Sequence, residues 1–284
     1  MTGILWLASY PKSGNTWLRA FLANYIRNGD APVSINELYH FNFGDDLLLY
    51  YTWMTGRSAE SFTDEEVWRL RPDVHRYLAG LTRETTLIKT HHVIGVQDDG
   101  TPMITPDVTD GAVYVVRNPL DVAVSMAHHY QITYDNAVDQ MCTPGNVLPG
   151  VPGEKLPQII GSWRENVGSW LQAPGLKRHV MCYEDMLAKP GPTFRELLRF
   201  LEMPVDGRRV AKAVRFSNFD NLTAQEQEQG FNEARPDEAA SFFRRGERGQ
   251  WREILTRDQV DRIVEASQDI MARFGYLDKK GRPV

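Results

Sequence analysis

Short apolar runs, each followed by a stretch with helical spacing, constrain the fold of this chain more than any other feature of its sequence. Runs with the composition of buried strands are Gly3–Ser9, Thr86–Thr90 and Gly111–Val116, with His179–Tyr183 as a fourth candidate. The helices predicted from apolar spacing are Asn15–Arg27, Pro119–His129, Ile159–Leu171, Thr193–Leu201 and Asp258–Phe274. Strands that alternate with helices predict a parallel sheet covered by helices on both faces. No shift in composition marks a boundary, so we expect one α/β domain over residues 1–284.

The composition narrows the class of protein. Hydrophobic residues make up 42% and charged residues 24%, which is ordinary for a globular chain. The formal charge of −5 gives no reason to expect nucleic acid or an anionic lipid surface as a partner. Two cysteines, Cys142 and Cys182, are too few for a secreted disulfide scaffold. The apolar run 4–10 is a poor signal peptide, and no window approaches the length of a membrane span. We therefore expect a cytoplasmic protein.

Three segments do not follow the alternation of strands and helices. Residues 38–54 are dense in aromatic side chains, and residues 141–157 are loop-like and rich in proline and glycine. Loops of this length are usually functional lids or disordered. The brief polar run Gln225–Gly230 predicts a short loop.

The first motif with chemical meaning is YPKSGNTW, residues 10–17, between a predicted strand and a predicted helix. Free backbone N–H groups and the helix dipole favour a phosphate at such a position, and Lys12 adds a full charge. Gly14 lets a ligand approach the backbone, and Ser13, Asn15 and Thr16 add donors. The lysine precedes the glycine, so the segment is not a Walker loop. Taken alone, an ordinary capped turn remains the alternative.

The second motif is RNPLD, residues 117–121, at the end of the third predicted strand, with Ser125 in the following helix. Arg117 and Ser125 can converge on one anion at the edge where open sheets bind ligands. A third motif, RRGERGQW at residues 244–251, is a local basic loop with two glycines in an acidic protein. Glycine lets backbone amides join arginine side chains around a phosphate. The alternative for the second motif is an arginine that is simply solvated. The alternative for the third motif is a charged face exposed to solvent.

The fourth motif is KTHH, residues 89–92, at the end of the second predicted strand. Lys89 and His91 share one face of an extended segment, so they can act together as charge stabiliser and base. His92 is the alternative base, but it points to the opposite face. No cluster of residues with metal-ligand spacing is present, and we expect no metal.

These four segments, in this order, resemble the motifs of the cytosolic-type sulfotransferases that use 3′-phosphoadenosine 5′-phosphosulfate (PAPS) and release 3′-phosphoadenosine 5′-phosphate (PAP). The resemblance covers the chain from about residue 3 to residue 274. It implies a sulfotransferase fold of the P-loop nucleotide-kinase type, with a central parallel sheet and flanking helices. Asn15 replaces a threonine that is usual in the family, and Arg245 replaces a lysine.

The resemblance also implies roles for individual residues. The 5′-phosphosulfate loop would comprise Lys12, Ser13, Gly14, Asn15, Thr16 and Trp17. The remaining cofactor-binding positions would be Arg117, Ser125, Tyr183, Ser217, Phe219, Arg244, Arg245 and Gly246. Of these, Trp17, Tyr183 and Phe219 would contact adenine, with Phe216 as the alternative register for Phe219. The catalytic residues would be His91 as general base and Lys12 and Lys89 as charge stabilisers.

The acceptor is the least determined part of the sequence-based hypothesis. Residues 38–54 and 141–157 are candidates for the walls and lid of its site, and the aromatic side chains of residues 38–54 favour an aromatic or apolar alcohol or phenol. An amine, a glycan or a glycopeptide remains open. A nucleotide-dependent kinase and a catalytically silent nucleotide-binding module are the alternatives to a sulfotransferase. The family's dimer motif is matched only loosely by residues 252–261, so the oligomeric state stays open.

Overall fold

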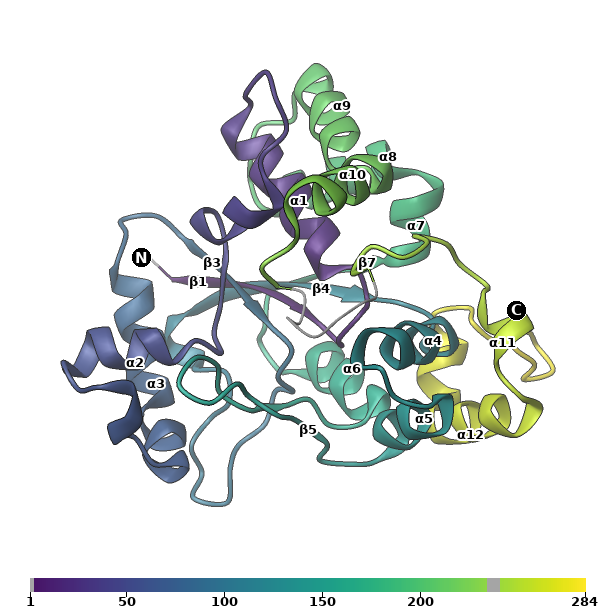
Figure 1. Ribbon diagram of the computed structural model, residues 1–284, viewed down its shortest axis with the longest axis horizontal. Helices are drawn as coiled ribbons and strands as arrows, with labels where there is room; N and C mark the ends of the chain where they lie inside the picture. The colour runs from purple at the N-terminus through teal and green to yellow at the C-terminus, as the bar shows by residue number, and fades with distance from the viewer. Residues whose placement is uncertain (1–2, 234–240) are drawn as a thin grey trace.

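A five-stranded parallel sheet forms the centre of the molecule in a computed structural model that describes residues 3–233 and 241–284 (Figure 1). The strand order is β2-β3-β1-β4-β7. The strands are β1 (Ile4–Ser9), β2 (Phe43–Gly44), β3 (Thr86–Thr90), β4 (Thr109–Val116) and β7 (Arg178–Cys182). Every neighbouring pair is parallel. The predicted α/β class with a parallel sheet is confirmed, and β2 is a strand that the sequence did not predict.

Helices cover both faces of this sheet (Figure 1). The α-helices are α1 (Asn15–Arg27), α2 (Leu48–Thr55), α3 (Asp64–Gly80), α4 (Pro119–Tyr130), α5 (Tyr134–Cys142), α6 (Trp163–Gln172), α7 (Tyr183–Ala188), α8 (Pro190–Phe200), α9 (Gly207–Phe216), α10 (Phe219–Gln229), α11 (Trp251–Ile254) and α12 (Arg257–Arg273). Short 3₁₀ helices are η1 (Ile35–His40), η2 (Ala59–Ser61) and η3 (Pro106–Val108). Strands β5 (Val147–Leu148) and β6 (Gln158–Ile159) form a separate antiparallel pair.

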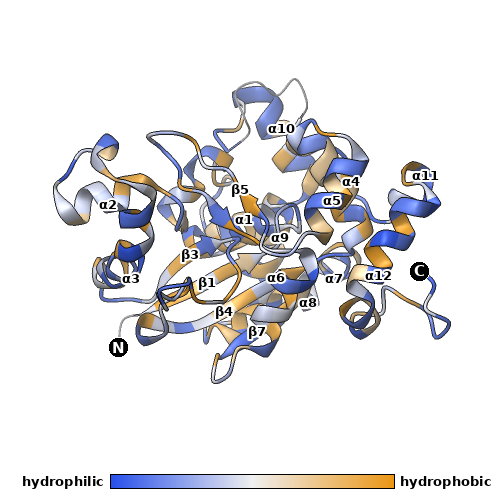
Figure 2. Ribbon diagram, turned by 90° about the horizontal axis from the view of Figure 1, so that it is seen from below, coloured by the Kyte–Doolittle hydropathy of each residue, from blue (hydrophilic) through white to orange (hydrophobic). Residues whose placement is uncertain are grey.

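Strand β1 is buried along its whole length because helices lie on both of its faces. Its side chains alternate between the faces, as a strand requires. Trp6 joins one core with residues of α3, α4 and α6, whereas Leu5 and Leu7 join another with residues of α1, α8 and α9. Figure 2 shows orange, hydrophobic colour along the strands at the centre of the molecule. This double burial explains why the strand reads as a continuous apolar run.

Two predicted elements differ from the structure. The helix predicted from Ile159 begins at Trp163, because Gln158–Ile159 pairs as β6 and Ser162 forms a capping box with Glu165. The loop predicted over Gln225–Gly230 is wrong, since α10 continues to Gln229. Glutamine and glutamate are good helix formers, and Gly230, at φ 70°, comes directly after the helix. No helix within the described residues is long and apolar enough to cross a membrane.

Candidate active site

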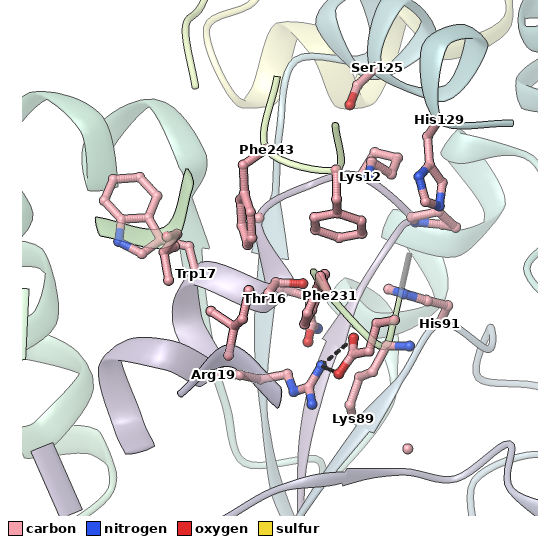
Figure 3. A pocket seen from close by; sticks show the side chains of 18 of the residues that line it. Lys12, Thr16, Trp17, Arg19, Lys89, His91, Ser125, His129, Phe231 and Phe243 are labelled. Carbon is pink, nitrogen blue, oxygen red and sulfur yellow. Dashed lines mark hydrogen bonds and ion pairs between the residues drawn. The ribbon is translucent and has the colours of Figure 1, made fainter. Parts of the chain in front are cut away.

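A cavity of about 580 Å³ opens beside the carboxyl ends of β1, β3 and β4. Because these strands are parallel, their carboxyl ends share one edge of the sheet, the usual place for a ligand in an open α/β fold. The lining comes from all four sequence motifs and from both segments proposed as acceptor walls. Figure 3 shows how side chains from these segments, distant along the chain, gather around the cavity. The fold therefore brings all the predicted site residues except Ser13 and Ser217 to the lining of one cavity.

The β1–α1 loop is shaped as a cradle at the N-terminus of a 13-residue helix. Lys12 and Gly14 both have a left-handed backbone, with φ of 63° and 103°. A Cβ on Gly14 would lie 2.6 Å from Cδ2 of Tyr183, so only glycine fits there. Asn15 holds the loop by donating its Nδ2 to the Leu7 carbonyl oxygen at 2.9 Å. Lys12, Asn15, Thr16 and Trp17 line the cavity with Gly14.

Ser13 belongs to the same loop, but its side chain is buried and is not part of the cavity lining. Its Oγ atom has no hydrogen-bond partner among the residues that the structure describes. A buried hydroxyl without a partner is unfavourable and calls for an explanation. The hydroxyl belongs to a loop at a helix N-terminus, a position that favours an anion.

Arg117 joins three of the motifs. Its Nη1 donates to the carbonyl oxygen of Lys12 at 3.0 Å, and its Nη2 donates to that of Glu247 at 3.1 Å. Its guanidinium also lies 4.4 Å from the ring centroid of Tyr183. The buried Nε atom has no partner within residues 3–233 and 241–284. Arg117 thus connects the β1–α1 loop to the basic loop, and its Nε–H group is left without an acceptor in the described chain.

The basic loop reaches the same cavity. Arg244, Arg245 and Gly246 line it, as does Ser125 of α4. Gly246 has φ 64°, and a Cβ there would lie 2.4 Å from Cδ2 of Phe219. The glycine therefore lets the loop backbone pack directly on the Phe219 ring. Two arginines, a hydroxyl and a close backbone together form a site suited to a phosphate group.

Aromatic side chains form the neighbouring wall. Trp17 and Tyr183 meet edge to face, with ring centroids 5.9 Å apart, and both line the cavity with Phe219. Phe216 does not line it, and its ring lies beneath the Arg215 guanidinium instead, so of the two alternatives only Phe219 lies at the cavity. Ser217 is buried and donates its hydroxyl to the Ala213 carbonyl oxygen at 2.9 Å. The structure therefore does not bring the Ser217 side chain to the cavity.

His91 stands at the carboxyl end of β3 in the orientation of a base. Its Nδ1 lies 2.7 Å from the Ser9 carbonyl oxygen, which can only accept, so Nδ1 carries the proton and Nε2 has its lone pair available. The pKa of His91 lies well below its usual value, first because of burial and then because of the charge of Lys89. The ring is therefore neutral near pH 7. Lys89 and Lys12 line the same cavity, and Figure 3 shows the side chains of Lys12, Lys89 and His91 in one region.

His92 faces the other way. It is fully buried, does not line the cavity, and accepts a hydrogen bond from the Ile159 backbone N–H at 3.1 Å through its Nδ1. The alternation of an extended chain separates the two histidines, as the sequence predicted. The geometry therefore favours His91 over His92 as the base.

The two segments proposed as acceptor walls contact each other. The Leu48 N–H donates to the Glu154 carbonyl oxygen at 2.9 Å, and the Leu156 N–H donates to that of Asp46 at 2.7 Å. Both segments line the cavity with apolar side chains that include Tyr39, Phe43, Leu47, Leu148 and Leu156. They also contribute the charged residues Asp46, Glu154 and Lys155, so the wall is not purely apolar.

Sequence reasoning missed one ion pair in the cavity, between Arg19 of α1 and Glu233. The sequence around Arg19 does indicate that this residue is unusual. It stands inside the run 18–25 of α1, which is otherwise apolar except for Asn24 and is buried throughout. A charged residue on the buried side of a helix needs a partner. Glu233 gave no such signal.

A strand–loop–helix cradle suited to an anion, beside a neutral histidine and two lysines, is an arrangement typical of group-transfer enzymes. The chain belongs to the sulfotransferase domain family, whose model matches residues 3–275, and it is a sulfotransferase. No group of three or more potential metal ligands occurs among the described residues.

Curated relatives match along most of their length. The chain is 26% identical to cytosolic sulfotransferase 17 of Arabidopsis thaliana, with 96% of this chain and 76% of the relative covered. It is 24% identical to flavonol 3-sulfotransferase of Flaveria bidentis, with 97% and 84% covered. The fold is similar to that of mouse sulfotransferase SULT7A1 complexed with PAP, with a TM-score of 0.59 at 20% identity and 95% and 84% of the two chains covered. It is also similar to retinol dehydratase complexed with androsterone and PAP, with a TM-score of 0.62 at 18% identity and 94% and 80% covered.

Proposed function

We propose that this protein transfers a sulfuryl group from PAPS to a hydroxyl group of a small acceptor, with His91 as the general base. The observation that carries the proposal is the free Nε2 of a neutral His91, in one cavity with Lys12 and Lys89. Family membership supports the reaction class. The mouse structure, which contains PAP, supports the same fold. The relatives named cytosolic support a cytoplasmic location.

The residues present fit such a nucleotide. Ser13 Oγ and Arg117 Nε are buried donors without partners in the described chain, and Gly14 and Gly246 line the cavity while their backbones pack against the rings of Tyr183 and Phe219. We assign Lys12 to Trp17 to the 5′-phosphosulfate, and Trp17, Tyr183 and Phe219 to the adenine. We assign Arg117, Ser125, Arg244, Arg245 and Gly246 to the 3′-phosphate. The buried hydroxyl of Ser217 is left without a direct role.

The chemistry needs little beyond positioning and charge. PAPS, when bound, supplies the activated sulfuryl group and a phosphate leaving group. His91 accepts the proton of the acceptor hydroxyl at Nε2, because Nδ1 is held by Ser9. Lys89 and Lys12 stabilise the negative charge that develops, as positioned cations do in phosphoryl transfer. The positive charge that stabilises it comes from side chains of the protein itself.

For the acceptor, we propose an aromatic or apolar alcohol or phenol. Tyr39, Phe43, Phe231 and Phe242 supply ring surface to the cavity. Residues 141–157, in which Glu154 and Leu156 pair with Leu48 and Asp46, then act as the lid. The charged side chains of Asp46, Glu154 and Lys155 indicate that the acceptor also carries a polar group.

Labelled-sulfate transfer tests this function directly. Purified protein is incubated with PAPS and a panel of phenols, sterols, amines and sugars, without added metal. A thermal-shift comparison of PAP with ATP tests the kinase alternative, since we expect PAP to raise the unfolding temperature in the absence of Mg²⁺. Stabilisation by ATP alone, with no labelled product in the panel, would contradict the proposal.

A further inference from the structure

A buried arginine stands in the cavity with its guanidinium held in one orientation. The Arg19 side chain is only 2% exposed. Its Nε donates to the side-chain oxygen of Asn42, and its Nη2 donates to the Asn42 carbonyl oxygen at 3.3 Å. Its Nη1 lies 2.7 Å from Oε1 of Glu233 and donates to Oε2 of the same carboxylate at 2.8 Å. Asn42 thus holds Arg19 with one edge of its donor fork presented to a carboxylate.

The Glu233 carboxylate occupies a pocket of positive charge. Burial raises the pKa of this carboxyl, but the charges of Arg19, Lys89 and Lys155 outweigh it, and the pKa lies below its usual value. The side chain remains 32% exposed, and it lines the cavity together with these three cations. A carboxylate of the protein itself therefore marks an anion site.

This anion site lies next to the proposed point of transfer. Figure 3 shows Arg19 beside Lys89, with His91 nearby and Ser125 on the far side of the cavity; dashed lines mark the pair with Glu233. Ser125 belongs to the proposed 3′-phosphate site, so the Arg19 site falls in the acceptor half. Lys155 reaches it from the segment that pairs with Asp46 and Leu48.

We propose that Arg19 and Lys155 form an anion subsite for the acceptor, and that this enzyme prefers hydroxyl acceptors that carry a carboxylate. The inference rests on the proposed function and adds a substrate class to it. A buried guanidinium is strongly unfavourable without a counter-ion, so a neutral acceptor leaves Glu233 in place. An acceptor carboxylate takes the position of Glu233 on Arg19 and keeps the buried charge paired. The planar fork of arginine matches a carboxylate better than it matches a hydroxyl.

Three phenols of similar size test the subsite: 4-hydroxyphenylacetate is anionic, 4-hydroxyphenylethanol is neutral and tyramine is cationic. Sulfation of each is measured with PAPS, and binding of each to the PAP-bound protein is measured by calorimetry. We expect 4-hydroxyphenylacetate to have a kcat/KM and an affinity about tenfold or more above those of the neutral phenol, the size of a hydrogen bond to a charged group.

Single substitutions then test the contribution of each charged residue to this preference. Arg19→Gln should abolish the preference for the anionic phenol. Glu233→Gln should increase that preference, because a neutral amide competes less well for Arg19. Lys155→Gln should reduce the preference and keeps the test valid if Arg19→Gln fails to fold. Arg27→Gln and Glu37→Gln are matched controls, since these residues form an exposed ion pair on α1 and η1 outside the cavity lining.

The possible outcomes distinguish a failure of the anion subsite from a failure of the proposed sulfotransferase function. Equal use and equal binding of the anionic and neutral phenols would overturn the subsite and leave the sulfotransferase intact. A preference for tyramine that is lost in Glu233→Gln would overturn it in favour of an amine site. Failure of PAP to bind at all would contradict the proposed function instead. If PAP binds but no phenol is sulfated, the calorimetric affinities test the subsite. Tighter binding of 4-hydroxyphenylacetate than of the neutral phenol would support it, and equal binding would overturn it.

Discussion

The carbonyl oxygen of Ser9, the last residue of β1, lies 2.7 Å from Nδ1 of His91, which follows the end of β3. The two residues are 82 positions apart in the chain but belong to neighbouring parallel strands. This single contact fixes the tautomer of the ring and leaves Nε2 as its acceptor. Asn166 fixes the backbone of His91 by donating to its carbonyl oxygen at 2.9 Å. The pairing of neighbouring strands therefore orients the ring that we propose as the general base.

Replacing His91 by alanine should remove turnover and spare nucleotide binding. Loss of a general base lowers kcat by about 10²- to 10⁴-fold. The thermal shift produced by PAP should stay close to that of the unmodified protein, because the ring is not assigned to the nucleotide. His40→Ala is the control, since His40 is exposed and does not line the cavity. A fully active His91→Ala protein would remove His91 from the mechanism.

Stability should fall as the pH drops below about 6.5. Burial holds the pKa values of His75, His91 and His92 well below their usual value. In the unfolded chain these groups take up protons near pH 6.5, so the unfolded state binds more protons than the folded state below that pH. Each histidine then lowers the free energy of unfolding by about 1.4 kcal/mol per pH unit.

Asp45 opposes this effect in part. Burial raises its pKa to about 6, so the folded state binds a proton there before the unfolded state does. Three groups against one still leave a net loss of stability between pH 6.5 and the folded pKa values of the histidines. Urea unfolding at pH 7.5, 6.5 and 5.5 measures this loss as a decrease in the free energy of unfolding. A free energy of unfolding that stayed constant or rose over this range would show that the buried histidines are not held neutral.

Replacing Ser125 by alanine should weaken PAP without affecting AMP. The two nucleotides differ in the 3′-phosphate, and Ser125 is assigned to that group alone. Loss of one hydrogen bond to a charged phosphate corresponds to about 1.5–3 kcal/mol, or roughly ten- to hundredfold in Kd. Calorimetric titration of both nucleotides measures the difference, with AMP as the internal control. An equal loss for both nucleotides would move Ser125 away from the 3′-phosphate.

Replacing Gly246 by alanine should weaken PAP and lower stability together. A Cβ at this position meets the Phe219 ring at 2.4 Å on a backbone with φ 64°, so the loop and the ring must separate. We expect a loss of about 1–3 kcal/mol in the free energy of unfolding and at least a tenfold weaker Kd for PAP.

Gly275→Ala is the matched control for Gly246→Ala. Gly275 has a similar φ of 71° but no atom within 4 Å of its added Cβ, so it carries the backbone strain without the contact. The control should lose some stability and keep its affinity for PAP. If Gly246→Ala behaved in the same way, the packing of Gly246 on Phe219 would have no role in binding.

The sequence by itself determined the local part of this protein. The bounds of α1 agree with the predicted helix, and β3 agrees with the predicted strand, because apolar period and end signals act over a few residues. The four motifs were visible for the same reason, since each is a short segment at the end of a strand or in a loop. Where a local signal was ambiguous the prediction was wrong, as in α10, whose polar residues are also good helix formers.

Only the tertiary structure decided which partners these local segments meet. Arg117 contacts Lys12 and Glu247, which lie 105 and 130 positions away, and Arg19 contacts Glu233 across 214 positions. No periodicity along the chain encodes such pairs, because they depend on how strands are ordered in the sheet and on which faces the helices cover. The sequence could place a histidine and a buried arginine. Packing of distant segments decided that the histidine is buried and neutral with its Nδ1 held by Ser9, and that the arginine faces a carboxylate in the same cavity.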